Sequence, residues 1–159
     1  CPNAFKPGTS EQKDSLTNVE ATGEFVFSMC TYELREQMII TAAVSPSSVD
    51  EMAQAGVESA PSINVKPPRV KASPIAMECK LLQVVDLPAA PDGARNNVVI
   101  GQVVGIHVAD EVISDGIIDV KKINPLARLG YLDYATLNLD SMFSLQPPGG
   151  DARFKPLAG

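Results

Sequence analysis

The spacing of apolar and polar positions changes several times along the first third of the chain. Residues 14–22 predict a short helix, which Asp14 can cap at its start and Gly23 at its end. Residues 24–30 alternate in the manner of a strand. Its apolar face would carry Phe25, Phe27 and Met29.

Two further helices are predicted before the centre of the chain. Residues 33–43 place apolar side chains four apart, at Leu34, Met38 and Ala42. Ser48 and Glu51 have the spacing of a capping box, which opens a two-turn helix that Gly56 closes.

The middle of the chain has the pattern of strands. Residues 74–85 and 97–108 predict two long strands joined by a loop rich in Pro and Asn, and therefore an antiparallel hairpin. Glu78 and Lys80 fall opposite the apolar face of the first strand, so that face is expected to be partly wet. The apolar face would carry Ile75, Met77, Cys79, Leu81 and Val85.

Shorter elements follow. Residues 112–118 predict a β segment broken at Asp115-Gly116, Asp119 can cap a turn of helix, and residues 130–139 predict a last strand. Long antiparallel strands close to remove exposed edges, so the fold class is mainly β with peripheral helices, a β-barrel. One domain would span 1–146, and 147–159 would form a flexible tail rich in Pro and Gly.

Composition excludes several classes of function. The chain has 159 residues and a net charge of −6, which argues against a nucleic-acid or anionic-membrane partner. No apolar run approaches the roughly 18–20 residues of a membrane span. Three cysteines without close spacing predict neither a disulfide framework nor a metal site. Cys30 and Cys79 are expected to be buried, and the protein to be cytoplasmic.

The chain has one histidine, His107, near the end of the second long strand. Gly101 and Gly105 share its face and would leave room for a ring or another backbone. His107 is therefore a candidate for orienting a ligand or moving a proton. The alternative is a histidine that only packs at the strand end.

A phosphate site is indicated before and at the start of the first helix. Helix N-termini bind anions through unpaired N–H groups and a positive dipole end. Lys13 would add a full charge, and hydroxyls would donate hydrogen bonds from Thr9, Ser10 and Ser15. Ordinary helix capping is the alternative.

Arg128 lies in a mostly apolar run, where a buried arginine would need a carboxylate or a phosphate partner.

Four segments, in order, resemble the flavin reductase-like, FMN-binding split-barrel family. Residues 13–28 resemble its KDT-x-x-N-I-x-x-T-G-E-F-V-V-N segment, and residues 67–79 its PPRV-x-x-SP-x-A-x-EC strand. Residues 98–107 resemble V-I-G-x-V-V-G-I-H, and residues 125–130 resemble P-x-A-R-L-G.

The resemblance implies a split β-barrel of Greek-key type, a homodimer, and flavin-dependent oxidoreduction in which NAD(P)H reduces FMN or FAD. It implies that the region from Thr9 to Asn18 holds the FMN phosphate, with Lys13, Asp14 and Ser15 at the KDT positions. Ser15 keeps the hydroxyl of the usual threonine. In such proteins the cofactor supplies the reacting atoms, so a dedicated catalytic residue is not required.

Family members carry an N-terminal stretch ahead of this region that supplies the first barrel strands. No such stretch precedes Cys1, so we expect an incomplete barrel and weak FMN binding by the chain as given. The alternative function is a flavin-binding module without turnover, and a further one is a scaffold domain without ligand.

Overall fold

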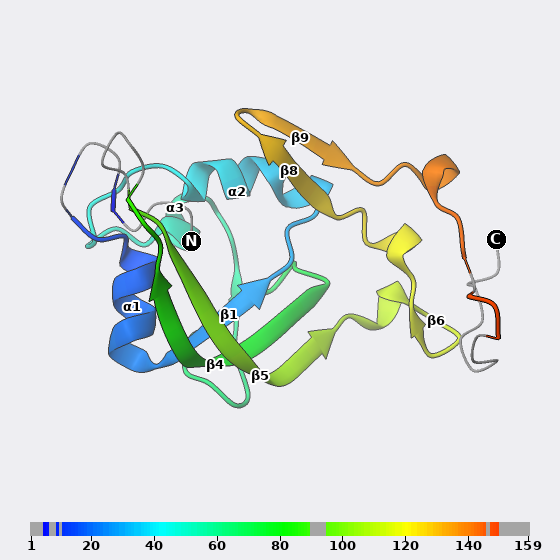
Figure 1. Ribbon diagram of the computed structural model, residues 1–159, viewed down its shortest axis with the longest axis horizontal. Coiled ribbons are helices and arrows are strands. Elements are labelled where there is room, and N and C mark those ends of the chain that lie inside the picture. The colour runs from blue at the N-terminus through cyan, green and yellow to red at the C-terminus, as the bar shows by residue number, and fades with distance from the viewer. Residues whose placement is uncertain (1–4, 7–8, 10, 90–94, 146, 150–159) are drawn as a thin grey trace.

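Strands dominate the centre of the chain and short helices flank them (Figure 1). The computed structural model describes residues 5–6, 9, 11–89, 95–145 and 147–149. The helices are α1 (Asp14–Thr22), α2 (Arg35–Thr41) and α3 (Glu51–Gln54). The strands are β1 (Glu24–Ser28), β2 (Ser59–Ala60), β3 (Arg69–Val70), β4 (Ile75–Asp86), β5 (Asn97–Val108), β6 (Ile113–Ser114), β7 (Ile117–Ile118), β8 (Leu126–Gly130) and β9 (Asp133–Thr136). The predicted class, mainly β with peripheral helices, is confirmed.

The largest sheet has the strand order β1-β4-β5, and both pairings are antiparallel. The two long strands form the predicted hairpin, which runs from the pair Ile75–Val108 to the pair Asp86–Asn97. The tip of its loop, residues 90–94, lies outside the described residues. Three two-stranded sheets, β2-β3, β6-β7 and β8-β9, complete the strands of the described part of the chain.

Two irregularities in the β4-β5 register change which side chains share a face. They lie between Glu78 and Cys79 and between Leu81 and Gln83. The second inserts one residue into β4, so Val84, and not the predicted Val85, packs with Leu81 against α1. The face opposite the apolar side chains is partly exposed, as expected, since Lys80 is exposed, but Glu78 on the same face is fully buried.

Helix α1 lies against this sheet (Figure 1). Its buried residues Leu16 and Val19 form a core cluster. The partly buried residues packed against that cluster are Phe5, Phe25, Leu81, Val84 and Val99. Gly101 leaves room for an aromatic ring, as predicted, because a Cβ there would lie 2.5 Å from Cζ of Phe25. This packing fixes the position of α1 relative to β4 and β5.

The ends of the helices differ in part from the prediction. Gly23 ends α1 in the left-handed conformation, as expected, with φ of 68°. The cap position at its start is Lys13, without a side-chain cap, and Asp14 is instead the first helical residue. For α3 the cap is Asp50, whose carboxylate accepts from the Ala53 N–H at 3.1 Å, so the predicted Ser48 capping box does not form.

The predicted helix over residues 33–43 is a 3₁₀ turn, Tyr32–Leu34, that continues into α2. Strands β6 and β7 meet at Asp115 and Gly116, where both φ values are positive, as the predicted break requires. The predicted last strand over residues 130–139 is confirmed only over β9, Asp133–Thr136. Residues 126–136 form the hairpin β8-β9, which turns at Tyr131 with φ of 48°. Tyr131 is a non-glycine residue with positive φ, a turn that the apolar pattern does not indicate.

Among the described residues, no helix combines the length and apolar character needed to span a membrane. Cys79 is buried, as predicted, and Cys30 is half-buried. Burial raises the pKa of both thiols. The predicted tail lies outside the described residues except for 147–149.

Candidate functional site

A hollow of about 260 Å³ lies at the start of α1. One wall carries Lys13, Asp14 and Ser15, which are three of the residues that the sequence places in a phosphate site. The opposite wall is the end of α2 and the loop after it, residues 41–45. Lys6 and Glu51 complete the lining. Packing of α1 on the sheet and of α2 near α3 therefore brings together two segments about 30 residues apart in sequence.

Lys13 is the cation of this hollow that is available to a ligand. Its side chain is half-exposed, and within the described part of the chain its ammonium group makes no hydrogen bond or ion pair. Lys13 is also the residue at which α1 begins, so its charge adds to the positive end of the helix dipole. The wall of α1 can therefore receive an anion.

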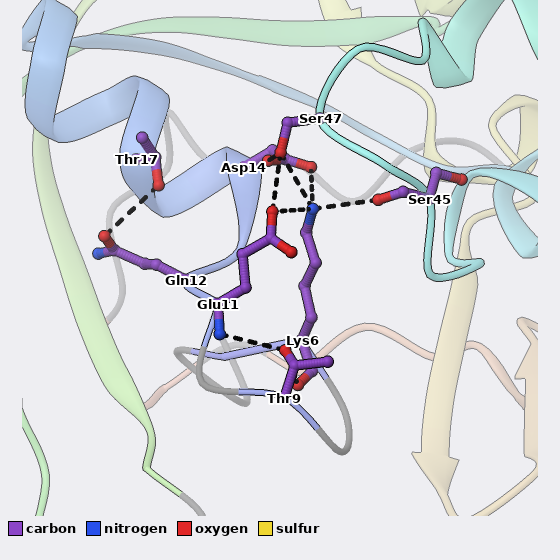
Figure 2. Close-up of polar contacts among 8 residues, drawn as sticks. All are labelled: Lys6, Thr9, Glu11, Gln12, Asp14, Thr17, Ser45 and Ser47. Atoms are coloured by element: carbon purple, nitrogen blue, oxygen red, sulfur yellow. Dashed lines mark hydrogen bonds and ion pairs between the residues drawn. The ribbon is translucent and has the colours of Figure 1, made fainter.

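Lys6 is different, because it is buried and fully engaged (Figure 2). Its Nζ lies 2.9 Å from Oε1 of Glu11 and 3.1 Å from Oδ2 of Asp14. It also donates to the Ser45 carbonyl oxygen at 3.0 Å and to Ser47 Oγ at 3.1 Å. Hydrogen bonding to Glu11, and less to Asp14, raises the pKa of Lys6. No local motif singles out Lys6, because its partners lie as far away as residue 47.

Asp14 uses both carboxylate oxygens inside this cluster. Oδ1 accepts from Ser47 Oγ at 2.5 Å, and Oδ2 faces Lys6. The hydrogen bond from Ser47, followed by that from Lys6, lowers the pKa of Asp14. The pKa of Glu11 is lowered by the same two groups, with Lys6 the larger cause. Both acids therefore stay ionised and hold the lysine between them.

The remaining predicted phosphate ligands are not gathered in the hollow. Thr9 Oγ1 donates to the Lys6 carbonyl oxygen and accepts from the Glu11 N–H, so it stabilises the turn before α1. Asn18 is exposed on α1 and does not line the hollow. Ser10 lies outside the described residues.

Arg128 is not buried, contrary to the expectation from its apolar surroundings in sequence. It lies on the exposed side of β8, and its guanidinium donates to the Tyr131 carbonyl oxygen at 3.1 Å. The same group lies 6.0 Å from the centre of the Tyr134 ring. The apolar run belongs to a two-stranded hairpin whose side chains are largely exposed, which is why apolar neighbours in sequence do not bury the arginine.

His107 lies opposite a carboxylate that the sequence does not locate. Its Nε2 is 2.5 Å from Oε1 of Glu78, on the neighbouring strand β4. Glu78 also accepts from the backbone N–H groups of Ile63 at 2.7 Å and Asn64 at 2.6 Å. The hydrogen bond from His107, assisted by these N–H groups against the effect of burial, lowers the pKa of Glu78 to about 2. An ionised carboxylate only accepts, so Nε2 of His107 carries the hydrogen.

A second, apolar pocket of about 260 Å³ adjoins the hollow and shares Thr41 and Glu51 with it. Its lining includes Met29, Met38 and Met52. Gln37 also lines it, and in the described part of the chain its buried Oε1 has no hydrogen-bond partner. Residues of α2 thus contribute to both cavities.

Comparison with known proteins places these features in context. Residues 2–128 match the family model described as "Flavin reductase like domain". An uncharacterized protein of Aquifex aeolicus is 34% identical over 119 residues, and one of Methanothermobacter thermautotrophicus is 32% identical over 120 residues. Each match covers 74% of this chain. The chain spans 58% and 56% of the length of these two curated relatives.

Solved structures share the fold. Nitrilotriacetate monooxygenase component B from Bacillus cereus is 31% identical, with a TM-score of 0.79, over 90% of this chain and 69% of that chain. Pseudomonas fluorescens 2-nitrobenzoate 2-nitroreductase is 26% identical, with a TM-score of 0.70, over 92% and 68%. A putative flavin reductase with a split barrel domain, from Shewanella frigidimarina, is 24% identical, with a TM-score of 0.69, over 84% and 64%. The arrangement of strands is therefore that of the split barrel.

Proposed function

The chain belongs to the flavin reductase-like domain family and has its split-barrel fold, and from this we propose that it is an FMN-binding oxidoreductase that uses NAD(P)H. The observation that carries the proposal is Lys13. It begins α1, lines the hollow there, and has no polar partner for its ammonium in the described part of the chain. A cation with these properties is suited to the phosphate of a nucleotide.

The residues present fit the phosphate end of a flavin. The donor set combines the Lys13 ammonium, the Ser15 hydroxyl and the N–H groups at the start of α1. Ser15 supplies the same kind of donor as threonine, the residue usual at this position. A hollow of about 260 Å³ has room for a phosphate and the adjoining sugar chain.

These residues would bind and orient the flavin, and a bound flavin supplies the electron-accepting chemistry itself. Lys13 and Ser15 would fix the phosphate, and the loop 41–45 would cover the opposite side of the hollow. His107 lies on β5 with its Nε2 held by Glu78, so it is positioned at one end of the sheet with a defined ring orientation. We assign it no step in the reaction.

The names of two similar structures support a redox role. The 31%-identical structure is component B of a monooxygenase, and the 26%-identical one is a nitroreductase. Because the chain spans little more than half of its curated relatives, the activity proposed is that of the whole protein.

The direct test is NAD(P)H oxidation by the full-length protein with FMN added, followed at 340 nm, together with FMN titration by fluorescence quenching. We expect turnover that depends on FMN, and a Lys13→Ala variant with weaker FMN affinity and unchanged thermal unfolding. Bound FMN without NAD(P)H oxidation would instead support a flavin-binding module. Failure of the wild-type protein to bind FMN or FAD would reject the proposal.

We also propose that the protein is a homodimer. In the described sheet β5 is an edge strand, and it exposes apolar side chains, with Ile106 63% exposed. Exposed apolar edge strands associate with other chains unless they are covered. Light scattering coupled to size exclusion would measure the mass, and an Ile106→Asp variant should shift it toward the monomer.

A further inference from the structure

We propose that Lys6 is a positioning residue for the ligand of the α1 hollow. It would act by joining the two walls of that hollow rather than by touching the ligand. This inference rests on the proposed function, because it takes a flavin phosphate as the ligand. The cluster that carries it consists of Lys6, Glu11, Asp14, Ser45 and Ser47, called here the Lys6 clamp (Figure 2).

The hydrogen bonds of Lys6 show why it would not contact a ligand directly. An ammonium group has three hydrogens to donate. Four acceptors, from Glu11, Asp14, Ser45 and Ser47, lie within 3.1 Å of its Nζ. The residue is only 6% exposed. Lys6 therefore has no donor left for a phosphate, although it lines the hollow.

The clamp joins segments that are distant in sequence. Lys6 and Glu11 precede α1, Asp14 is in its first turn, and Ser45 and Ser47 belong to the loop between α2 and α3. Ser47 Oγ lies 2.5 Å from Asp14 Oδ1 and 3.1 Å from Glu11 Oε1, which adds a second connection between the same segments. The loop therefore cannot move away from α1 without breaking the hydrogen bonds that its neutral Ser45 carbonyl and Ser47 hydroxyl make with the charged side chains beside the helix.

The same two segments form the walls of the hollow. Lys13, Asp14 and Ser15 line one side, and residues 41–45 line the other. Breaking the clamp would let the loop separate from α1 while Lys13 and Ser15 stayed on the helix. A ligand would then have to order the loop itself, and its affinity would fall by the free energy of that ordering. Asp14, at a family motif position, would act in the same way, through Lys6 and Ser47.

The sharpest variant is Ser47→Ala, which removes three clamp contacts without changing the charge of the hollow. Its matched control is Ser48→Ala, since Ser48 is exposed and makes no hydrogen bond within the described residues. We expect Ser47→Ala to raise the Kd for FMN about 3- to 10-fold, the effect of one or two lost hydrogen bonds, and Ser48→Ala to leave it unchanged. Amide exchange of Val49, whose N–H donates to the Pro46 carbonyl oxygen in this loop, should speed up in Ser47→Ala alone.

A second variant separates position from charge. Lys6→Met with Asp14→Asn removes one positive and one negative group, so the net charge of the hollow is kept while the clamp is lost. We expect FMN affinity to fall at least as far as in Ser47→Ala, with circular dichroism reporting that the fold is retained. Lys6→Arg alone keeps the charge and can donate to the same acceptors, so it should bind FMN more tightly than the double variant does.

The outcomes distinguish this inference from the function on which it rests. If wild type binds FMN and both Ser47→Ala and the charge-balanced double variant bind it equally well, the positioning role is wrong while the proposed function stands. If Lys6→Met alone weakens binding but the double variant restores it, Lys6 acts through its charge, and the positioning role is again wrong. If wild type binds neither FMN nor FAD, both proposals fail together.

Discussion

The carboxylate of Glu78 and the imidazole of His107 form a hydrogen bond of 2.5 Å across the pair β4-β5. Glu78 is 0% exposed and His107 has a side chain 20% exposed, so the pair connects the interior of the sheet to its surface. Glu78 also holds residues 63 and 64 through two backbone N–H groups. The Glu78 side chain therefore connects the loop at residues 63 and 64 to the end of β5 at His107.

This pair predicts acid sensitivity. The pKa of Glu78 falls from 4.5 to about 2 in the folded protein, first because of the hydrogen bond to His107. A lowered carboxyl pKa contributes stability that is present above the unfolded value and is lost as the pH falls through the folded one. We therefore expect the free energy of unfolding to decrease between pH 4.5 and about 2.

The contribution of Glu78 is isolated by comparing wild type with Glu78→Gln in denaturant titrations across this pH range. The variant keeps the shape of the side chain but loses the titration, and it should have a lower free energy of unfolding than wild type at pH 7. The gap between the two proteins should close as the pH falls. Glu11 and Asp14 titrate in both proteins, so they cancel in the difference. Parallel stability curves would contradict the assignment.

Glycine at position 101 is expected to be required by the packing of Phe25. In Gly101→Ala the new Cβ would lie 2.5 Å from Cζ of the half-buried Phe25 and 3.2 Å from Cβ of the buried Cys79. Overpacking of this kind costs about 1–3 kcal/mol. Gly105→Ala is the comparison, because its Cβ would meet the end of the exposed Asn64 side chain, which can move at the cost of its hydrogen bond to Glu78. Urea unfolding should show the larger loss for Gly101→Ala.

The sequence predicts the elements of the sheet better than the faces of its strands. Strands β4 and β5 are indicated by long alternating runs, and their pairing follows from the loop between them. The burial of Glu78 does not follow, because the loop that supplies the N–H groups of Ile63 and Asn64 is about 15 residues away in sequence and has no pattern that indicates its position. The one-residue irregularity in β4 likewise turns Val84, in place of Val85, toward α1, and no feature of the sequence indicates it.

The candidate site likewise contains some residues that the sequence predicts and others that it does not. Lys13 and Ser15 line the hollow where a local motif predicts a site, because both lie within a few residues of the start of α1. Lys6 and Ser47 are not predicted, since they meet only after α1 and α2 have packed. For Arg128 the sequence predicts burial from its apolar neighbours, but the residue is exposed because β8 belongs to a two-stranded hairpin.

Core packing of α1 should affect both stability and ligand binding. Leu16 is buried between α1 and the sheet with Val19, and Leu16→Ala should cost about 2–5 kcal/mol through lost contacts and the cavity that remains. Because Lys13 and Ser15 are carried by the same helix, FMN affinity should fall as well. Thr17→Ala, on the exposed side of α1, is the control; it loses only an exposed 3.4 Å hydrogen bond to Gln12 and should change neither property appreciably. Chemical unfolding and FMN titration of the same preparations would check both parts, and an unchanged stability in Leu16→Ala would contradict the packing.

Gln37 is a half-buried residue with a buried side-chain oxygen, and its replacement by an apolar residue should not be destabilising. Its Oε1 is inaccessible and has no hydrogen-bond partner among the described residues, in a pocket lined by Met29, Met38 and Met52. Such an atom loses hydration on folding and recovers nothing in return. Gln37→Met, of similar length, should therefore leave the free energy of unfolding unchanged or raise it by up to about 1 kcal/mol. Guanidinium unfolding of the ligand-free protein measures this, and a clear loss of stability would mean that Oε1 has a partner, such as an ordered water.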